Sequence, residues 1–208
     1  MTAISASDLV FYYTNTGNSI SATSLALGGT IGLNTITDNT SQNIFTDVTG
    51  DQSASGQTLY RAIALFNNHA DHNLTSAKLW ISAYTAGPPD TISIATERPI
   101  NDPAAIQIIA SETVAPVSGS MITDWKTEVV ATSSANCCTL GSSIGIGTIA
   151  FKEWAGIWLK REVPASATAV NDRTFVLYVQ GETSASPYIS QVTKEFKLVW
   201  REDGIFYS

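Results

Sequence analysis

Apolar and polar residues alternate in many short runs along the chain, and this two-residue period predicts β-strands. The run 174–181 is the clearest, because Phe175, Leu177 and Val179 fall on one face. Helical periodicity is scarce, and only residues 46–55 are a candidate for a short helix. The predicted strands are residues 8–13, 57–66, 76–84, 91–96, 105–110, 127–131, 143–149, 154–163, 174–181 and 195–201.

The pattern also indicates how some of these strands are arranged. Residues 57–66 are apolar on both faces, which is typical of a strand in the centre of a sheet. The polar stretch 67–73 follows, and we predict that it is the turn of a hairpin between 57–66 and 76–84. We also predict that 154–163 pairs with 174–181, the next strand along the chain.

Many short strands separated by turn signals predict an all-β fold. We expect a single antiparallel β-sandwich domain over residues 1–208, of jelly-roll or immunoglobulin-like type. Residues 14–43 are polar, contain glycine and are weakly periodic, so we predict that they form a long loop or an extended N-terminal arm. No internal repeat of fixed period is present.

Composition narrows the classes of function. Charged residues make up 14% of the chain and the net charge is -7. The 11 basic residues are scattered, which argues against a nucleic-acid-binding protein, because phosphate binding needs clustered Lys and Arg. No stretch is apolar enough to span a membrane, and the start of the chain lacks the pattern of a signal peptide. We therefore expect a protein that folds in a cytoplasm and binds neither nucleic acid nor membrane.

One histidine pair is a candidate for chemistry. His69 and His72 flank Asp71, and two imidazoles with a carboxylate can bind a metal or exchange protons. The chain has only these 2 histidines, no third strong ligand is evident, and the predicted hairpin turn would expose them. We interpret the group as a solvated turn, and we expect no metal site.

Other motifs also have structural interpretations. Asp47 and Asp51 lack the dense acidic spacing of a calcium loop. The sequence 145–150 has the glycine spacing of a dinucleotide fingerprint, but no helix is predicted after it. Cys137 and Cys138 are adjacent, so we interpret them as partly buried thiols rather than a metal pair or a catalytic dyad with a histidine. We expect no cofactor and no catalytic residues, although a carboxylate pair in a cleft stays open.

Several segments resemble virion structural proteins of tailed bacteriophages. They include Asn43-Ile-Phe-Thr-Asp-Val-Thr-Gly-Asp-Gln-Ser-Ala-Ser-Gly-Gln-Thr-Leu-Tyr-Arg61 and Leu74-Thr-Ser-Ala-Lys-Leu-Trp-Ile81. The segment Gly156-Ile-Trp-Leu-Lys-Arg-Glu-Val-Pro-Ala-Ser-Ala-Thr-Ala-Val-Asn-Asp-Arg-Thr-Phe175 is similar to a second recurrent pattern, and Leu25-Ala-Leu-Gly-Gly-Thr-Ile31 to a third. The resemblance implies a small, non-catalytic structural protein of the virion, and it carries over no functional residue.

On this basis we expect a capsid decoration or cement protein located in the virion. Its expected partners are the major capsid protein and other copies of itself, with a trimer favoured. A tail, baseplate or neck protein, with tail proteins as partners, is the first alternative. A host-carbohydrate-binding module is the second, because 5 Trp and 7 Tyr offer flat rings for sugars. The candidate assembly contacts are Leu25, Leu27, Ile31, Leu33, Ile36, Phe206 and Tyr207.

Overall fold

The computed structural model describes residues 3–15, 26–85, 90–100, 105–117, 122, 125–127, 142–168, 170–183 and 191–202. These residues form strands with two short helical segments, which confirms the all-β prediction. The helical segments are η1 (Ala6–Asp8) and α1 (Gly50–Ser55). The strands are β1 (Leu9–Asn15), β2 (Gly28–Thr35), β3 (Gln57–Asn67), β4 (Leu74–Tyr84), β5 (Thr91–Ile100), β6 (Ile106–Ile108), β7 (Lys126–Thr127), β8 (Ile144–Ile149), β9 (Trp154–Val163), β10 (Val170–Thr183) and β11 (Gln191–Glu202).

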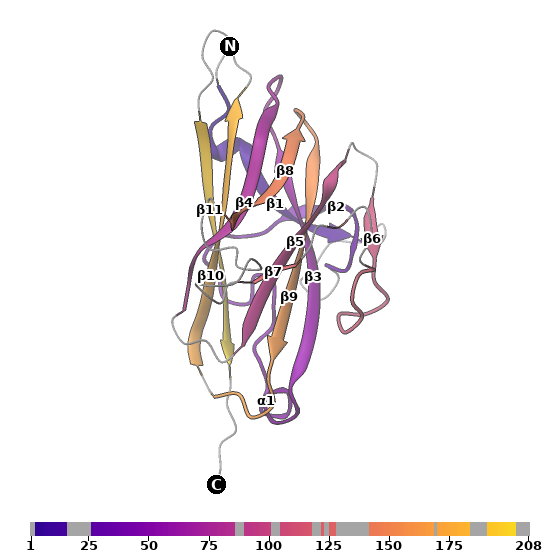
Figure 1. Cartoon of the computed structure of the whole chain (residues 1–208), viewed down its shortest axis with the longest axis vertical. Helices are drawn as coiled ribbons and strands as arrows, with labels where there is room; N and C mark the ends of the chain where they lie inside the picture. Colours follow the sequence, from indigo (N-terminus) through magenta and orange to yellow (C-terminus); the bar gives the residue numbers. More distant parts are fainter. Residues whose placement is uncertain are drawn as a thin grey trace.

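The strands form two layers, as Figure 1 shows. One sheet has seven strands in the order β6-β2-β1-β3-β9-β5-β7, and the other has four in the order β11-β10-β4-β8. All pairings between these named strands are antiparallel. The antiparallel β-sandwich is therefore confirmed, with its main core between the two sheets.

The period of two explains which side chains enter this core. On β10, Phe175, Leu177 and Val179 are fully buried between the sheets, as their shared face predicts. On β3, Leu59 and Ile63 face the same core, while intervening alanines face outward into a second apolar cluster. Because β3 lies between β1 and β9, the prediction of a central strand is also confirmed.

Both predicted strand pairings are wrong, because each connection crosses from one sheet to the other. β3 belongs to the seven-stranded sheet and β4 to the four-stranded sheet, and β9 and β10 are divided in the same way. The turn after β3 is shaped for this crossing. The Asn67 side-chain amide donates to the carbonyls of His72 (2.9 Å) and Ile149 (3.1 Å), and so ties the turn to β8 of the opposite sheet.

Residues 14–43 are only partly a loop, so the prediction of an arm needs correction. Within the described part, 28–35 form strand β2, which pairs with β1 and β6. Gly28 makes this possible, because its φ is 95° and a Cβ there would overlap the Gln107 carbonyl oxygen. The strand was not predicted because its sequence is rich in Gly, Thr and Asn and shows little alternation of apolar residues.

Residues 36–43 are irregular and lie along the edge of β11. The Asn39 N–H donates to the Lys197 carbonyl (3.1 Å) and the Gln42 N–H to the Val199 carbonyl (2.8 Å). The Val199 N–H donates in turn to the Asn43 side-chain oxygen (3.1 Å). This segment therefore occupies backbone groups of an edge strand that would otherwise be open to another chain.

The shorter elements agree with the sequence pattern to different degrees. The helix predicted within 46–55 is confirmed as α1, whose first turn Thr49 and Gln52 cap reciprocally. β6 is shorter than the predicted strand 105–110. Of the predicted strand 127–131, residue Thr127 belongs to β7, and residues 128–131 lie outside the described residues.

A second apolar cluster covers the outer face of the seven-stranded sheet. Trp154 and Trp158 are fully buried there, packed with Ile106 and Ile109 of the segment that folds over this face. Gly156 lets the segment come close, since a Cβ at this position would stand 2.7 Å from Cγ2 of Ile106. Because they are fully buried, Trp154 and Trp158 serve as packing residues and offer no ring face to a sugar.

Candidate functional site

Residues 105–117, which we call the flap, cover the outer face of the seven-stranded sheet. Its β6 part pairs with β2 at the edge of this sheet, and two further hydrogen bonds fix its backbone. The Tyr60 N–H on β3 donates to the Glu112 carbonyl (2.7 Å), and the Ile109 N–H donates to the Leu27 carbonyl (3.0 Å). The flap is therefore held as part of the domain and is not a free loop.

Charged side chains also hold the flap. Arg61 is 1% exposed and forms an ion pair with Glu112. Glu97, which is also buried, accepts hydrogen bonds from the indole N–H of Trp158 (2.9 Å) and from the backbone N–H of Gln107 (3.1 Å). A buried carboxylate with two donors is a satisfied structural group.

A side-chain clamp closes the end of the flap. The amide of Gln107 donates to the Val117 carbonyl (3.0 Å), and its oxygen accepts from the Val117 N–H (2.9 Å). Two parallel hydrogen bonds fix the chain direction at Val117 in the way that a strand partner would. The flap thus has a defined conformation along most of its length.

This fixed segment exposes apolar side chains. Ile108, Val114 and Val117 are 58%, 46% and 74% exposed, and we call them the flap side chains. In the described residues they form half of the large apolar residues that are strongly exposed, the others being Leu33, Tyr84 and Phe151. A rigid segment that presents several apolar side chains to solvent is suited to contact another protein.

The structure places the candidate assembly contacts very differently from one another. Leu33 is 81% exposed, and Leu27 and Ile31 are half-buried against the outer cluster. Ile36 is 6% exposed and packs in the main core, so its side chain is already covered by the domain itself. Leu25, Phe206 and Tyr207 lie outside the described residues.

Sequence reasoning missed the flap side chains. The alternation in 105–110 indicated a half-buried strand, but nothing local shows that this strand crosses the back of a sheet. Ile106 and Ile109 are buried in the outer cluster while Ile108, two residues after Ile106, is exposed, so the alternation of a regular strand does not continue through this segment. The close approach of Ile106 to Gly156 on β9 joins residues far apart in the sequence, so the flap's own sequence does not indicate it.

The two histidines of the turn are buried although Asn68, Ala70 and Asp71 beside them are exposed, so the prediction that the turn exposes the histidines is wrong. His69 and His72 are each 7% exposed, and their rings stack with centroids 4.9 Å apart. Nδ1 of His69 accepts hydrogen bonds from the backbone N–H groups of Asp71 (3.2 Å) and His72 (3.1 Å). These bonds require an unprotonated Nδ1, so this nitrogen serves the turn and its lone pair is occupied.

No metal site is formed by this turn. Asp71 Oδ1 lies 3.2 Å from Nδ1 of His69, a nitrogen already engaged by two N–H groups, and 3.7 Å from Nε2 of His72. Within the described ranges, no group of three or more His, Cys, Asp or Glu is arranged to hold a metal ion.

The remaining motifs also have structural positions. Asp47 accepts from Gln42 (2.8 Å), and residues 145–149 lie in β8.

Two further arginines, buried inside the sandwich, were not singled out from the sequence. Arg173 and Asp90 are each fully buried and form an ion pair, with Nε and Oδ1 2.6 Å apart. Arg161 is also fully buried, with its guanidinium 4.7 Å from the ring centroid of Phe45 and a hydrogen bond to the Thr46 carbonyl (2.8 Å). These charges bind parts of the chain to one another.

Cys137 and Cys138 lie outside the described residues. The helical segments that are described are too short to cross a membrane.

Comparison with known proteins does not identify a family. No protein-family model and no curated protein matches the sequence. Among solved structures, the N-terminal domain of PorA has a TM-score of 0.36 at 8% identity, covering 85% of this chain and 97% of that one. AggA, the major subunit of aggregative adherence fimbriae type I from Escherichia coli, has a TM-score of 0.37 at 8% identity, with coverage of 76% and 89%.

A family 123 glycoside hydrolase from Clostridium perfringens has a TM-score of 0.32 at 12% identity. The match covers 78% of this chain but spans only 23% of that enzyme. All three scores are too low to support an argument about function.

Proposed function

We propose that this protein is a non-catalytic structural component of a tailed-phage virion, and specifically a decoration or cement protein that binds the head shell. The phage assignment depends on the sequence resemblance of residues 25–31, 43–61, 74–81 and 156–175. The observation that supports a binding role is the flap, a segment fixed by the Arg61–Glu112 ion pair and by hydrogen bonds that exposes Ile108, Val114 and Val117.

Docking through the flap has a clear physical basis. Burial of one Val or Ile side chain contributes roughly 1.5–3 kcal/mol, so three such side chains can anchor a modest interface. The flap keeps its conformation when it binds, so little ordering entropy opposes association. Many copies on one particle add avidity, and a trimer around a symmetry axis would use a heterologous interface. The partner surface would be the major capsid protein.

The test uses particles made without this gene. Purified protein is mixed with the particles, and electron microscopy locates added density. We expect density on the head, and we expect Ile108→Asp and Val117→Asp to weaken binding at least about tenfold, since each charge would have to be desolvated in the interface. Tyr84→Asp places the same charge at an exposed apolar residue of the four-stranded sheet, and it should bind like the unmodified protein.

Two results would overturn the proposal. Density on the tail, baseplate or neck would replace the head role with the first alternative. Absence of density anywhere, with a protein that is folded by circular dichroism, would remove the virion role altogether.

A further inference from the structure

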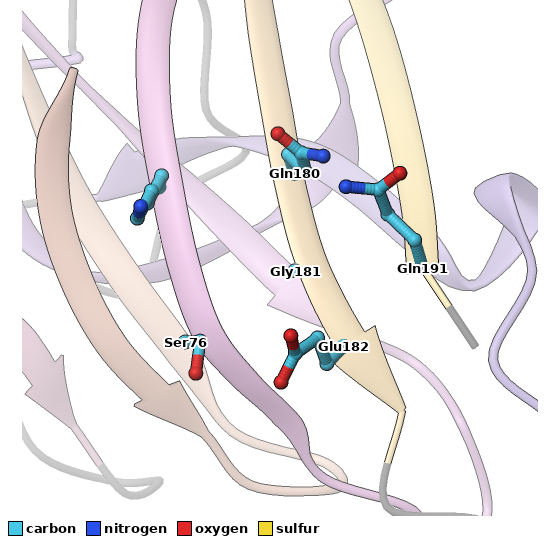
Figure 2. A pocket seen from close by; sticks show the side chains of 6 residues that line it. Ser76, Gln180, Gly181, Glu182 and Gln191 are labelled. Atoms are coloured by element: carbon cyan, nitrogen blue, oxygen red, sulfur yellow. The ribbon is translucent and has the colours of Figure 1, made fainter. Parts of the chain in front are cut away.

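A polar hollow lies on the outer face of the four-stranded sheet, on the opposite layer from the flap. Its volume is about 130 Å³, and Figure 2 shows side chains of three neighbouring strands around it. The residues that line it are Ser76 and Lys78 of β4, Gln180, Gly181 and Glu182 of β10, and Gln191 of β11. Nothing in the proposed assembly role uses this surface.

Irregular strand pairing shapes the hollow. The register between β4 and β10 shifts between Gln180 and Glu182, and the register between β4 and β8 shifts on both sides of Ala77. Ser76 has a φ of 51°, which is unusual for a residue other than glycine within a strand. Such bulges redirect side chains and are frequent next to functional sites.

The polar side chains around the hollow are not committed to one another. In the part of the chain that the structure describes, the side chains of Lys78, Gln180, Glu182 and Gln191 form no hydrogen bond or ion pair. By contrast, Lys160 and Glu162 on the other sheet pair at 2.7 Å. Figure 2 shows the amides of Gln180 and Gln191 turned toward each other between β10 and β11, and the Glu182 carboxylate on the β4 side.

An aromatic ring stands on the same face of the same strand. Tyr178 is two residues from Gln180, and the pairing of β10 with β11 is regular between them, so both side chains point outward about 7 Å apart. Tyr178 is half-buried and packs on Trp80 with ring centroids 4.4 Å apart. Trp80 itself is 8% exposed, so it supports the tyrosine rather than reaching a ligand.

We propose that this hollow binds a single sugar residue. Amides both donate and accept hydrogen bonds, and a carboxylate accepts two, which matches the adjacent hydroxyls of a pyranose. A tyrosine ring beside these groups can pack against the apolar face of the sugar. One carboxylate is too few for a divalent cation, and the charges of Lys78 and Glu182 cancel so that the lining attracts neither ion class, which makes a neutral sugar the ligand class that fits.

The experiment is a nuclear magnetic resonance titration of the full ¹⁵N-labelled chain. The probes are the methyl glycosides of glucose, galactose, mannose and rhamnose, together with N-acetylglucosamine, at millimolar concentrations. We expect saturable shifts of the side-chain amide signals of Gln180 and Gln191 with at least one probe. Gln180→Ala and Gln191→Ala assign these two signals.

Glu182→Gln should weaken binding by up to about tenfold, because one charged acceptor is lost. Glu162→Gln is the matched control, since it alters a partly exposed glutamate on a strand of the other sheet, and it should leave the titration unchanged. The proposal is overturned if no probe gives a saturable shift, or if both glutamate variants change binding equally. The amide spectrum of each variant shows whether it is folded.

Discussion

Buried charges are the least expected residues in this sandwich. Arg173 and Asp90 have no solvent exposure, and their attraction must offset the loss of hydration of both ions. Arg61 and Arg161 are buried as well, and each contacts a segment more than 50 residues away in sequence. Arginine, which a sequence pattern would place at the surface, therefore links segments in the interior of this fold.

Removal of the acidic partner should be strongly destabilising. In Asp90→Asn the Arg173 guanidinium stays buried but loses the carboxylate charge 2.6 Å from its Nε, so we expect the free energy of unfolding to fall by about 3–5 kcal/mol. Urea denaturation measures the change. Glu162→Gln, which breaks the partly exposed pair with Lys160, should cost less than about 1 kcal/mol. Equal losses in the two variants would show that the buried pair has no special weight.

His69 should matter as a hydrogen-bond acceptor. His69→Ala leaves the backbone N–H groups of Asp71, which is exposed, and His72, which is buried, without their acceptor, at a cost of roughly 1–3 kcal/mol in unfolding free energy. His69→Asn keeps an acceptor at nearly the same place and should recover about 1 kcal/mol or more of this loss. Thermal denaturation of the two variants side by side decides the point. If asparagine is no better than alanine, ring packing and not hydrogen bonding is what His69 contributes.

Asp8 gives a prediction about pH. Burial raises the pKa of its carboxyl, but hydrogen bonds from the Ser5 N–H (2.8 Å) and hydroxyl (2.7 Å) outweigh this and lower the pKa below its ordinary value of 3.8. A lowered folded-state pKa stabilises the protein above the ordinary value, and the stabilisation disappears as the pH falls through the folded-state pKa. The stability advantage over Asp8→Asn should therefore shrink as the pH falls below about 5 and through the lowered folded-state pKa.

Denaturant titrations across this range test the sign. Ser5→Ala removes the hydroxyl donor and should reduce the advantage in the same direction. A difference between the two proteins that stays constant with pH would contradict the assignment.

At the scale of elements, the strands themselves follow from local pattern but their partners do not. The alternation on β10 and the two apolar faces of β3 are properties of short segments, and both were correctly interpreted. The change of sheet between β3 and β4 depends on Asn67, which bonds to Ile149 far along the chain. The flap depends on Glu97, which is close to it in the sequence, and on Arg61 and Gly156, which are distant.

A matched pair of glycine variants tests how closely the flap packs. Gly156→Ala puts a Cβ 2.7 Å from Ile106, and this overpacking should cost about 1–3 kcal/mol and raise hydrogen exchange in residues 105–117. Gly145→Ala adds the same methyl group where nothing lies within 4 Å, so it should be neutral or stabilise by about 0.5 kcal/mol. Unchanged exchange in the flap of Gly156→Ala would show that the flap is not seated as described.

At the scale of the whole molecule, Asn43 is a second polar residue, after Asn67, that joins the two sheets. The Tyr13 hydroxyl on β1 donates to the Asn43 carbonyl (2.6 Å), and the Asn43 side chain bonds to both Lys197 (2.9 Å) and Val199 (3.1 Å) on β11. Asn43 is 4% exposed, so these bonds are shielded from water. Sequence pattern gave no sign of this role, because asparagine in a polar segment is ordinary and its partners are about 150 residues away.

Asn43→Ala should therefore affect the molecule as a whole. The substitution removes the side-chain hydrogen bonds to β11, including the one from the buried Val199 N–H, so we expect a loss of about 2–4 kcal/mol in unfolding free energy. It should also open the edge of β11, where an unpaired strand is a template for another chain, so faster hydrogen exchange in 197–199 and concentration-dependent association are expected. Thr40→Ala in the same segment removes only a weak exposed hydrogen bond of 3.4 Å and should change neither property. Asn43→Ala could lose stability while exchange in 197–199 stays slow and the protein stays monomeric. That result would show that the segment 36–43 stabilises the core but does not prevent association through the edge of β11.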